Sequence, residues 1–218
     1  SESSVWAILY DIYDTAAAAG DTLALGFDPI WDVLIGAQRI TPAFTSIFTF
    51  ITALKAVQPA SVAAIDALLS AQNIVTNTNA FGTTETNLPV GMLSNSVFPL
   101  YTTLNNTGTI TVRSSNDAGT TNKVGNHRYI RFENASARDV SISLATSNTE
   151  ANADPDFLVW RAGTFVVAGV DIPDGMPETE EIEDLPAGTY VIDIYDCGNG
   201  CNPAEGASGD FDLTLTIN

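Results

Sequence analysis

The stretch Leu185-Pro-Ala-Gly-Thr-Tyr-Val-Ile-Asp-Ile-Tyr-Asp196 places Tyr190, Ile192 and Ile194 at alternate positions, with Val191 and Asp193 between them. Two-residue alternation of this kind, closed by Gly, Pro, Asp or Asn, is typical of a β-strand with one buried face. The last ten residues, Gly209-Asp-Phe-Asp-Leu-Thr-Leu-Thr-Ile-Asn218, repeat the pattern to the end of the sequence. Both stretches therefore predict strands that cover a common core.

Six further short segments that read as strands precede these two. Their close, turn-separated spacing favours an antiparallel β-sandwich over alternating β-α units. The acidic run at residues 178–184 is expected on an exposed edge, where charge discourages edge-to-edge aggregation. The six runs are residues 109–113, 128–132, 140–144, 157–160, 164–170 and 178–182.

The N-terminal part has helical rather than strand periodicity. Its first helix carries one apolar stripe suited to packing on the following helices and a second, aromatic stripe beside it, so it is apolar around most of its girth. Such a helix needs neighbours on two sides. The first stripe is Val5, Ile8, Leu9 and Ile12, and the second is Trp6, Tyr10 and Tyr13.

Three later helices are predicted to begin at Asp28-Pro29, Thr41-Pro42 and Gln58-Pro59, because proline is favoured at the first helical position and Asp and Thr are good caps. Together these patterns predict an α+β protein of two domains. We expect a helical lobe at residues 1–79, a linker at 80–108 with one extended piece at residues 97–104, and an antiparallel, jelly-roll-like β-sandwich at 109–218.

The charge balance excludes one class of partner. The chain has 8 Lys and Arg against 26 Asp and Glu, a formal net charge of -18, whereas nucleic-acid binding requires a basic surface. We interpret the acidity as a solvated surface, with cation binding as the alternative. No apolar run is long enough to predict a membrane span.

The only two cysteines are Cys197 and Cys201, separated by Gly-Asn-Gly. This spacer allows a tight turn, so we predict a disulfide between them and a secreted or periplasmic location. A metal or redox pair is the alternative, but the chain has neither a second Cys pair nor a nearby histidine as further ligands.

The sequence offers little for catalysis. His127 is the only histidine, so a triad or a zinc site could take at most one member from it. The nucleophile, zinc-helix and phosphate-loop motifs are absent. We therefore predict a structural role for His127, no catalytic residue in this chain and no zinc.

Three motifs in the C-terminal half carry a family resemblance: Asp154-Pro-Asp-Phe, Leu185-Pro-Ala-Gly-Thr-Tyr-Val and Gly209-Asp-Phe-Asp-Leu-Thr-Leu. They resemble the bacterial pre-peptidase C-terminal (PPC) domain, a β-sandwich appended to many secreted proteases, and the resemblance covers residues 124–218. It implies an extracytoplasmic accessory domain.

Calcium is the cofactor that the residue types favour, because it binds hard oxygen ligands in flexible loops. Asp154 and Asp156 lead into a predicted strand, and Asp196 precedes the Cys197 turn. Some sandwiches that resemble the PPC family bind calcium near such positions. These three aspartates are therefore the candidate metal ligands, although their spacing does not supply a full ligand set.

The helical half is similar to the region downstream of the zinc-binding helix in secreted bacterial metalloproteases. The motifs that carry this resemblance are Ser4-Val-Trp-Ala-Ile-Leu-Tyr-Asp-Ile-Tyr-Asp14, Gly26-Phe-Asp-Pro-Ile-Trp-Asp-Val-Leu-Ile-Gly36, Thr41-Pro-Ala-Phe-Thr-Ser-Ile-Phe-Thr-Phe-Ile-Thr-Ala-Leu-Lys55 and Phe81-Gly-Thr-Thr-Glu-Thr-Asn87. The His-Glu-x-x-His helix itself is absent, so no catalytic residue is carried over.

Two functional hypotheses follow. The first is a non-catalytic C-terminal part of a secreted metalloprotease-like protein, which supports the protease fold and its secretion, maturation or substrate targeting. Its partner would be the upstream catalytic region of the same protein or an extracellular substrate. The alternative is a free-standing secreted binding module for carbohydrate, matrix protein or calcium. An exposed aromatic stripe on the first helix favours the first hypothesis, and a row of aromatics on one sheet face favours the second.

Overall fold

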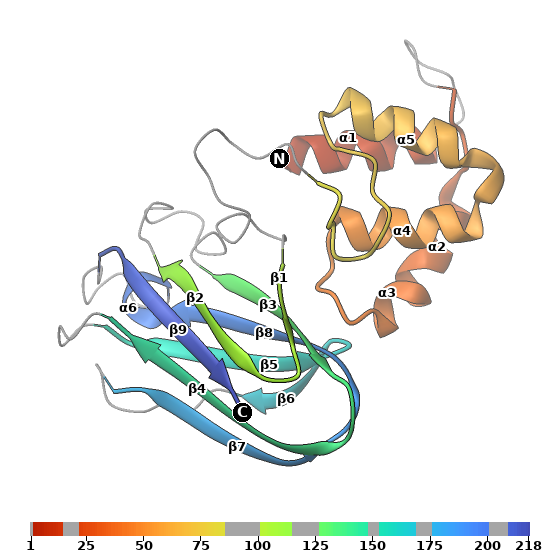
Figure 1. Cartoon of the computed structure of the whole chain (residues 1–218). Helices are drawn as coiled ribbons and strands as arrows, with labels where there is room; N and C mark the ends of the chain where they lie inside the picture. Colours follow the sequence, from red (N-terminus) through yellow and green to blue (C-terminus); the bar gives the residue numbers. More distant parts are fainter. Residues whose placement is uncertain are drawn as a thin grey trace. The chain divides into compact units, whose positions relative to one another are not determined.

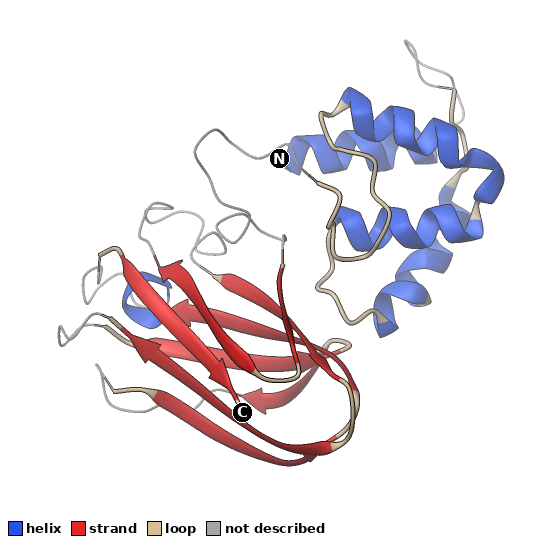
Figure 2. Ribbon diagram, viewed as in Figure 1, coloured by secondary structure: helices blue, strands red, loops and turns tan. Residues whose placement is uncertain are grey.

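The computed structural model describes residues 2–14, 22–85, 101–114, 127–147, 153–168, 176–200 and 209–218. The chain forms two compact units, residues 1–90 and 91–218, and each has its own hydrophobic core. The first unit is helical and the second is built from strands (Figures 1 and 2). The predicted fold class, a helical region followed by an antiparallel β-sandwich, is confirmed.

The helical unit packs its elements in neighbouring pairs. Helix α1 contacts α5, and α2 contacts both α3 and α4. Ile8 and Ile12 of the predicted first stripe are fully buried in the core. The elements are α1 (Glu2–Tyr13), α2 (Phe27–Ile35), α3 (Ala37–Ile40), α4 (Ile47–Val57), the 3-10 turn η1 (Pro59–Ser61) and α5 (Val62–Ala71).

Two of the three predicted helix starts are displaced. The N-cap of α2 is Gly26, so Asp28 lies in the first turn and not at the cap. Helix α4 begins after Ser46, whose side-chain oxygen accepts a hydrogen bond from the Thr49 N–H in a capping box. Proline sets φ but does not satisfy the free N–H groups of a helix start, and at α4 Ser46 does so. The third start is confirmed, since Pro59 opens η1 and α5 follows.

The second unit is a sandwich of two sheets. One has five strands in the order β1-β3-β8-β5-β6, and the other has four in the order β2-β9-β4-β7. All described pairings are antiparallel except that of β1 with β3. The strands are β1 (Thr102–Asn105), β2 (Gly108–Ser114), β3 (Arg128–Asn134), β4 (Arg138–Thr146), β5 (Pro155–Arg161), β6 (Thr164–Ala168), β7 (Glu178–Leu185), β8 (Gly188–Asp196) and β9 (Phe211–Ile217).

The core between the two sheets contains the alternating apolar residues of β8 and β9, as predicted. Tyr190, Ile192 and Ile194 of β8 are fully buried, and their counterparts on β9 are buried as well. The Tyr190 hydroxyl donates a hydrogen bond to the Pro186 carbonyl at 2.7 Å, which anchors the Leu-Pro-Ala-Gly turn to the strand. The buried residues of β9 are Phe211, Leu213, Leu215 and Ile217.

Strand β1 lies within the range predicted to be a linker. It pairs in parallel with β3, Thr103 opposite Arg131, and the following turn is held by a hydrogen bond from the Asn106 N–H to the Glu133 carbonyl. The strand overlaps the extended piece predicted at residues 97–104, but its pairing with β3 was not predicted, because that partner is distant in sequence.

The acidic run forms β7, an edge strand of the four-stranded sheet, as predicted. Glu178 at its start is the exception to the expected exposure, with only 1% of its surface accessible. No single helix in the described ranges has the length and apolarity needed to cross a membrane.

Candidate functional site

The candidate site lies where strand β5 begins and strand β8 ends. The two strands are antiparallel neighbours, with Pro155 opposite Asp196 and Asp156 opposite Tyr195. The residues on either side of Pro155 therefore share a sheet face with the residues on either side of Asp196. This register brings Asp154 and Asp156 next to Cys197, which opens the short helix α6 (Cys197–Gly200).

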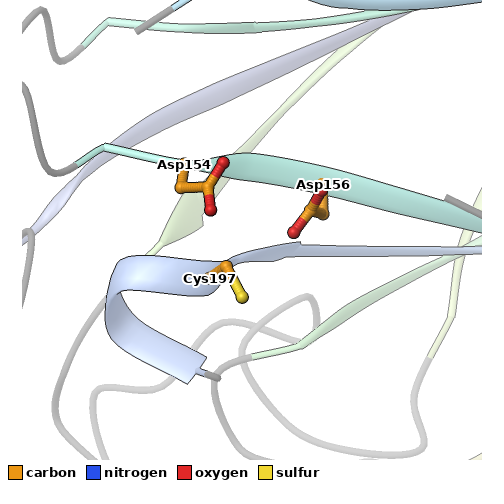
Figure 3. Close-up of side chains that lie close together, drawn as sticks. All are labelled: Asp154, Asp156 and Cys197. Atoms are coloured by element: carbon orange, nitrogen blue, oxygen red, sulfur yellow. The ribbon is translucent and has the colours of Figure 1, made fainter. Parts of the chain in front are cut away.

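Asp154, Asp156 and Cys197 form the cluster shown in Figure 3. One potential ligand atom from each, a carboxylate oxygen or the Sγ, lies within 4.8 Å of the other two, and all three residues are partly exposed. Two of the three aspartates predicted as metal ligands are thus brought together. A cation between them would be reachable from solvent.

Asp196, the third predicted ligand, has a structural task. Its carboxylate is fully buried, and it accepts hydrogen bonds from the Asp154 N–H at 2.7 Å and the Asn199 N–H at 2.8 Å. The second bond caps α6, and the first ties the start of β5 to the end of β8. The Cys197 N–H donates to the Asp154 carbonyl at 2.6 Å and completes the link. Asp196 thus supports the backbone that carries the other two aspartates.

The electrostatics around Tyr195 show how acidic this end of the sandwich is. Burial raises the pKa of Tyr195, and the carboxylates of Asp156, Asp193, Asp154 and Glu178 raise it further. Each of these carboxylates is negatively charged and therefore disfavours the deprotonated, negatively charged form of Tyr195. The same negative charges favour a bound cation.

Of the three candidate ligand atoms of Asp154, Asp156 and Cys197, only the two carboxylate oxygens suit calcium. Carboxylate oxygens are the ligands that calcium takes, whereas a sulfur is not. The disulfide between Cys197 and Cys201 stays a prediction, because Cys201 lies outside the described residues; such a bond would also remove the Cys197 Sγ as a thiolate ligand. The calcium assignment of Asp154, Asp156 and Asp196 likewise stays a prediction.

Calcium binding at this cluster can be tested by thermal unfolding. A ligand that binds only the folded state stabilises it by about 2.7 kcal/mol at one hundred times its dissociation constant. We therefore expect millimolar calcium to raise the melting temperature relative to chelator, and Asp156→Asn to remove most of the rise. Asp212→Asn, an exposed change on β9 of the other sheet, is the matched control and should keep it. An unchanged melting curve in calcium would remove calcium from this site.

His127 directly precedes β3 and belongs to an aromatic cluster that the sequence did not predict. Its Nδ1 lies 2.7 Å from the Asp193 Oδ1, and its ring stacks on Tyr195 at 4.7 Å between centroids. The Tyr129 ring is also stacked with it, at 6.2 Å between centroids. This arrangement agrees with a structural role at a strand end. The only available signal was that Tyr129 and Tyr195 alternate out of phase with the core residues of their strands.

No protein-family profile and no curated protein matches the chain, but the sandwich is similar to solved structures. The pre-peptidase C-terminal domain of collagenase from Bacillus anthracis is 14% identical, with a TM-score of 0.36 over 54% of this chain and 94% of its own. PliG of Aeromonas hydrophila, a periplasmic inhibitor of g-type lysozyme, is 10% identical, with a TM-score of 0.32 over 54% and 96%. A carbohydrate binding module from Cellvibrio mixtus lichenase 5A, in complex with cellotriose, is 17% identical, with a TM-score of 0.25 over 52% and 86%. These likenesses concern the fold alone.

Proposed function

We propose that this chain is a non-catalytic part of a larger secreted protein, in which the helical unit packs against a neighbouring domain and the sandwich is an appended accessory module. The observation that carries the proposal is the exposed aromatic stripe of α1. Trp6, Tyr10 and Tyr13 are 68%, 50% and 51% exposed. A free-standing helical unit would bury such side chains in its own core, because each is worth about 1.5–3 kcal/mol when buried.

The exposure extends beyond α1. Nine of the twelve exposed large apolar side chains in the described ranges belong to the helical unit, although the sandwich has more described residues. On α2, Phe27 and Trp31 contact each other at 6.0 Å and are each at least half exposed. Exposed apolar surface on this scale marks a protein interaction surface.

The resemblance of the helical motifs to secreted metalloproteases supports the catalytic region of the same protein as the neighbour. The single histidine supports the non-catalytic assignment, because neither a zinc site nor a histidine triad can be assembled from it within this chain. The predicted disulfide supports an extracytoplasmic location.

The fluorescence of Trp6 tests the proposal. With Trp31→Phe and Trp160→Phe, Trp6 is the sole tryptophan, and we expect acrylamide to quench it readily in this chain alone. In the protein read from the complete open reading frame, quenching should fall severalfold because the neighbouring domain covers α1. Replacing Tyr10 and Tyr13 by Gln, a good helix former, should restore quenching by weakening the contact.

Two outcomes would overturn the proposal. One is equal quenching of Trp6 in both proteins, which leaves the stripe without a partner domain. The other is quenching of the isolated chain that falls as its concentration rises, because this would show that a second copy covers the stripe. The matched control is Phe165→Gln on the sandwich, which should change neither result.

A further inference from the structure

Helix α2 is apolar on two sides. Ile30 and Val33 are buried and belong to the core of the helical unit. A second apolar stripe runs along the outward side at steps of three and four residues, and its four side chains are between 43% and 53% exposed. A surface helix normally has one apolar stripe, which faces its own core. The second stripe, which we call the α2 stripe, consists of Phe27, Trp31, Leu34 and Ile35.

Two acidic residues border the α2 stripe. Asp28 and Asp32 each follow an aromatic residue of the stripe by one position. Because residues four apart share a face of a helix, the two carboxylates form a row along one side of the stripe. Both aspartates are exposed, and neither has an ion pair within the ranges that the structure describes. The apolar stripe and its negative border are thus both open to solvent.

The helical unit has little positive charge of its own to neutralise this border. In the sequence of residues 1–90 the only basic residues are Arg39 and Lys55. Lys55 is ion-paired with Asp66, and Arg39 belongs to the separate helix α3. The two aspartates of α2 are therefore available to a basic partner.

The geometry favours a helix as that partner. Phe27, Trp31 and Ile35 form a ridge along α2, and such a ridge packs into the groove between the side-chain rows of a second helix. A helix satisfies its own backbone hydrogen bonds, so it can lie on an apolar surface without leaving N–H or C=O groups unpaired. An extended segment would place unpaired backbone groups against the stripe.

We propose that the α2 stripe, with Asp28 and Asp32, binds an amphipathic helix whose apolar face is bordered by lysine or arginine, and that the neighbouring domain of the same protein supplies this helix. The apolar contact contributes most of the affinity, and the opposite charges fix which way round the helix lies. The inference rests on the proposed function, and it goes further by naming the chemistry of the segment that covers this surface.

The acidic border argues against two other occupants. A second copy of the chain would bring the same two aspartates and a further net charge of -18, so like charges would meet. A helix that lies on an anionic membrane usually carries lysine or arginine beside its apolar face, whereas α2 carries acids. Charge complementarity therefore selects a basic protein segment.

Trp31 reports on the stripe directly, because in the full chain with Trp6→Phe and Trp160→Phe it is the sole tryptophan. We would titrate this protein with a blocked peptide of about 18 residues, long enough to form a helix, with leucine on one face, lysine along one border and alanine elsewhere. The expected result is a saturable decrease in acrylamide quenching of Trp31 that weakens in high salt. The same peptide with glutamate in place of lysine should bind at least about tenfold more weakly.

Variants separate this site from general attraction to an acidic protein. Asp28→Asn combined with Asp32→Asn should weaken binding of the lysine peptide about fivefold, the effect of losing two exposed charge pairs. Ile35→Gln should also weaken it about fivefold, because it removes a half-exposed apolar side chain from the contact. The matched control is Glu181→Gln with Glu183→Gln, which removes two exposed charges from β7 of the sandwich and should leave the affinity unchanged.

Three results would overturn the inference: no protection of Trp31 by the lysine peptide, equal affinity for the glutamate peptide, or equal weakening in the aspartate and glutamate double variants. Protection of Trp31 by phosphatidylserine vesicles in the absence of peptide would assign the stripe to a membrane instead. Protection by a rise in protein concentration alone would assign it to a second copy.

The quenching of Trp6 in the complete protein tests the proposed function separately. If Trp6 is covered there but Trp31 does not respond to the lysine peptide, the proposed function stands and this inference fails. If Trp31 responds but Trp6 is quenched equally in both proteins, the proposed function fails and the basic helix must come from another protein.

Discussion

Asp196→Ala is expected to lower the free energy of unfolding of the sandwich by about 3 kcal/mol. The fully buried carboxylate accepts hydrogen bonds from two backbone N–H groups, those of Asp154 and Asn199. A hydrogen bond to a charged group contributes about 1.5–3 kcal/mol, and each N–H left without an acceptor carries a further desolvation cost. The two bonds share one side chain, so their contributions are not additive.

Trp160 gives a signal for this measurement that belongs to the sandwich. With Trp6→Phe and Trp31→Phe, tryptophan fluorescence in a urea titration reports unfolding of the sandwich alone. Asp196→Asn retains one carbonyl acceptor and should lose about half as much stability as Asp196→Ala. The exposed Asp212→Asn should stay within about 0.5 kcal/mol of the parent. An Asp196→Ala variant as stable as Asp212→Asn would contradict the capping role.

The strands could be predicted because their signal is local. Every second residue of β8 and β9 packs into one core, so the sequence alternates within each strand and needs no knowledge of the partner. The starts of these strands are also marked in the sequence, by Pro186 before β8 and Gly188 as its first residue, and by Gly209 before β9. The strand ranges predicted in the described part of the sandwich are confirmed for this reason.

Helix starts and the pairing of β1 were less predictable than the strands, because no single short motif decides either of them. Thr41-Pro42 satisfies the proline rule, yet Thr41 follows the unpredicted helix α3 as its C-cap. The capping box of Ser46 and Thr49 decides the start of α4. Strand β1 depends on a register with β3, which begins 26 residues later in the chain.

The candidate site likewise has one part that the sequence predicted and one part that it did not. Asp154 and Asp156 are two residues apart where the chain enters β5, so their spacing alone predicted that they lie close together. The contact of His127 with Asp193 joins residues 66 positions apart and requires the pairing of β3 with β8. Short-range spacing therefore identified the acidic pair, but it could not identify the aromatic cluster around His127.

Gly82→Ala is expected to lower the free energy of unfolding of the helical unit by about 3 kcal/mol. Gly82 has a φ of 64°, a left-handed conformation that costs an alanine about 1–2 kcal/mol. An added Cβ would also lie 2.7 Å from Cδ2 of the Phe48 ring. Phe48 is 6% exposed on α4, so its ring cannot move aside freely, and overpacking of this kind costs about 1–3 kcal/mol.

A double-mutant cycle separates the two contributions. Fluorescence of Trp6 and Trp31, with Trp160→Phe, reports the helical unit, and Phe48→Leu removes the ring that the Cβ would meet. In the Phe48→Leu background Gly82→Ala should cost only about 1 kcal/mol, which is the backbone contribution alone. Gly26→Ala is the matched control in the same helical unit, because its φ is 73° and an added Cβ would meet no atom within 4 Å. If Gly82→Ala costs no more than Gly26→Ala when Phe48 is intact, the close packing of Gly82 against α4 is wrong.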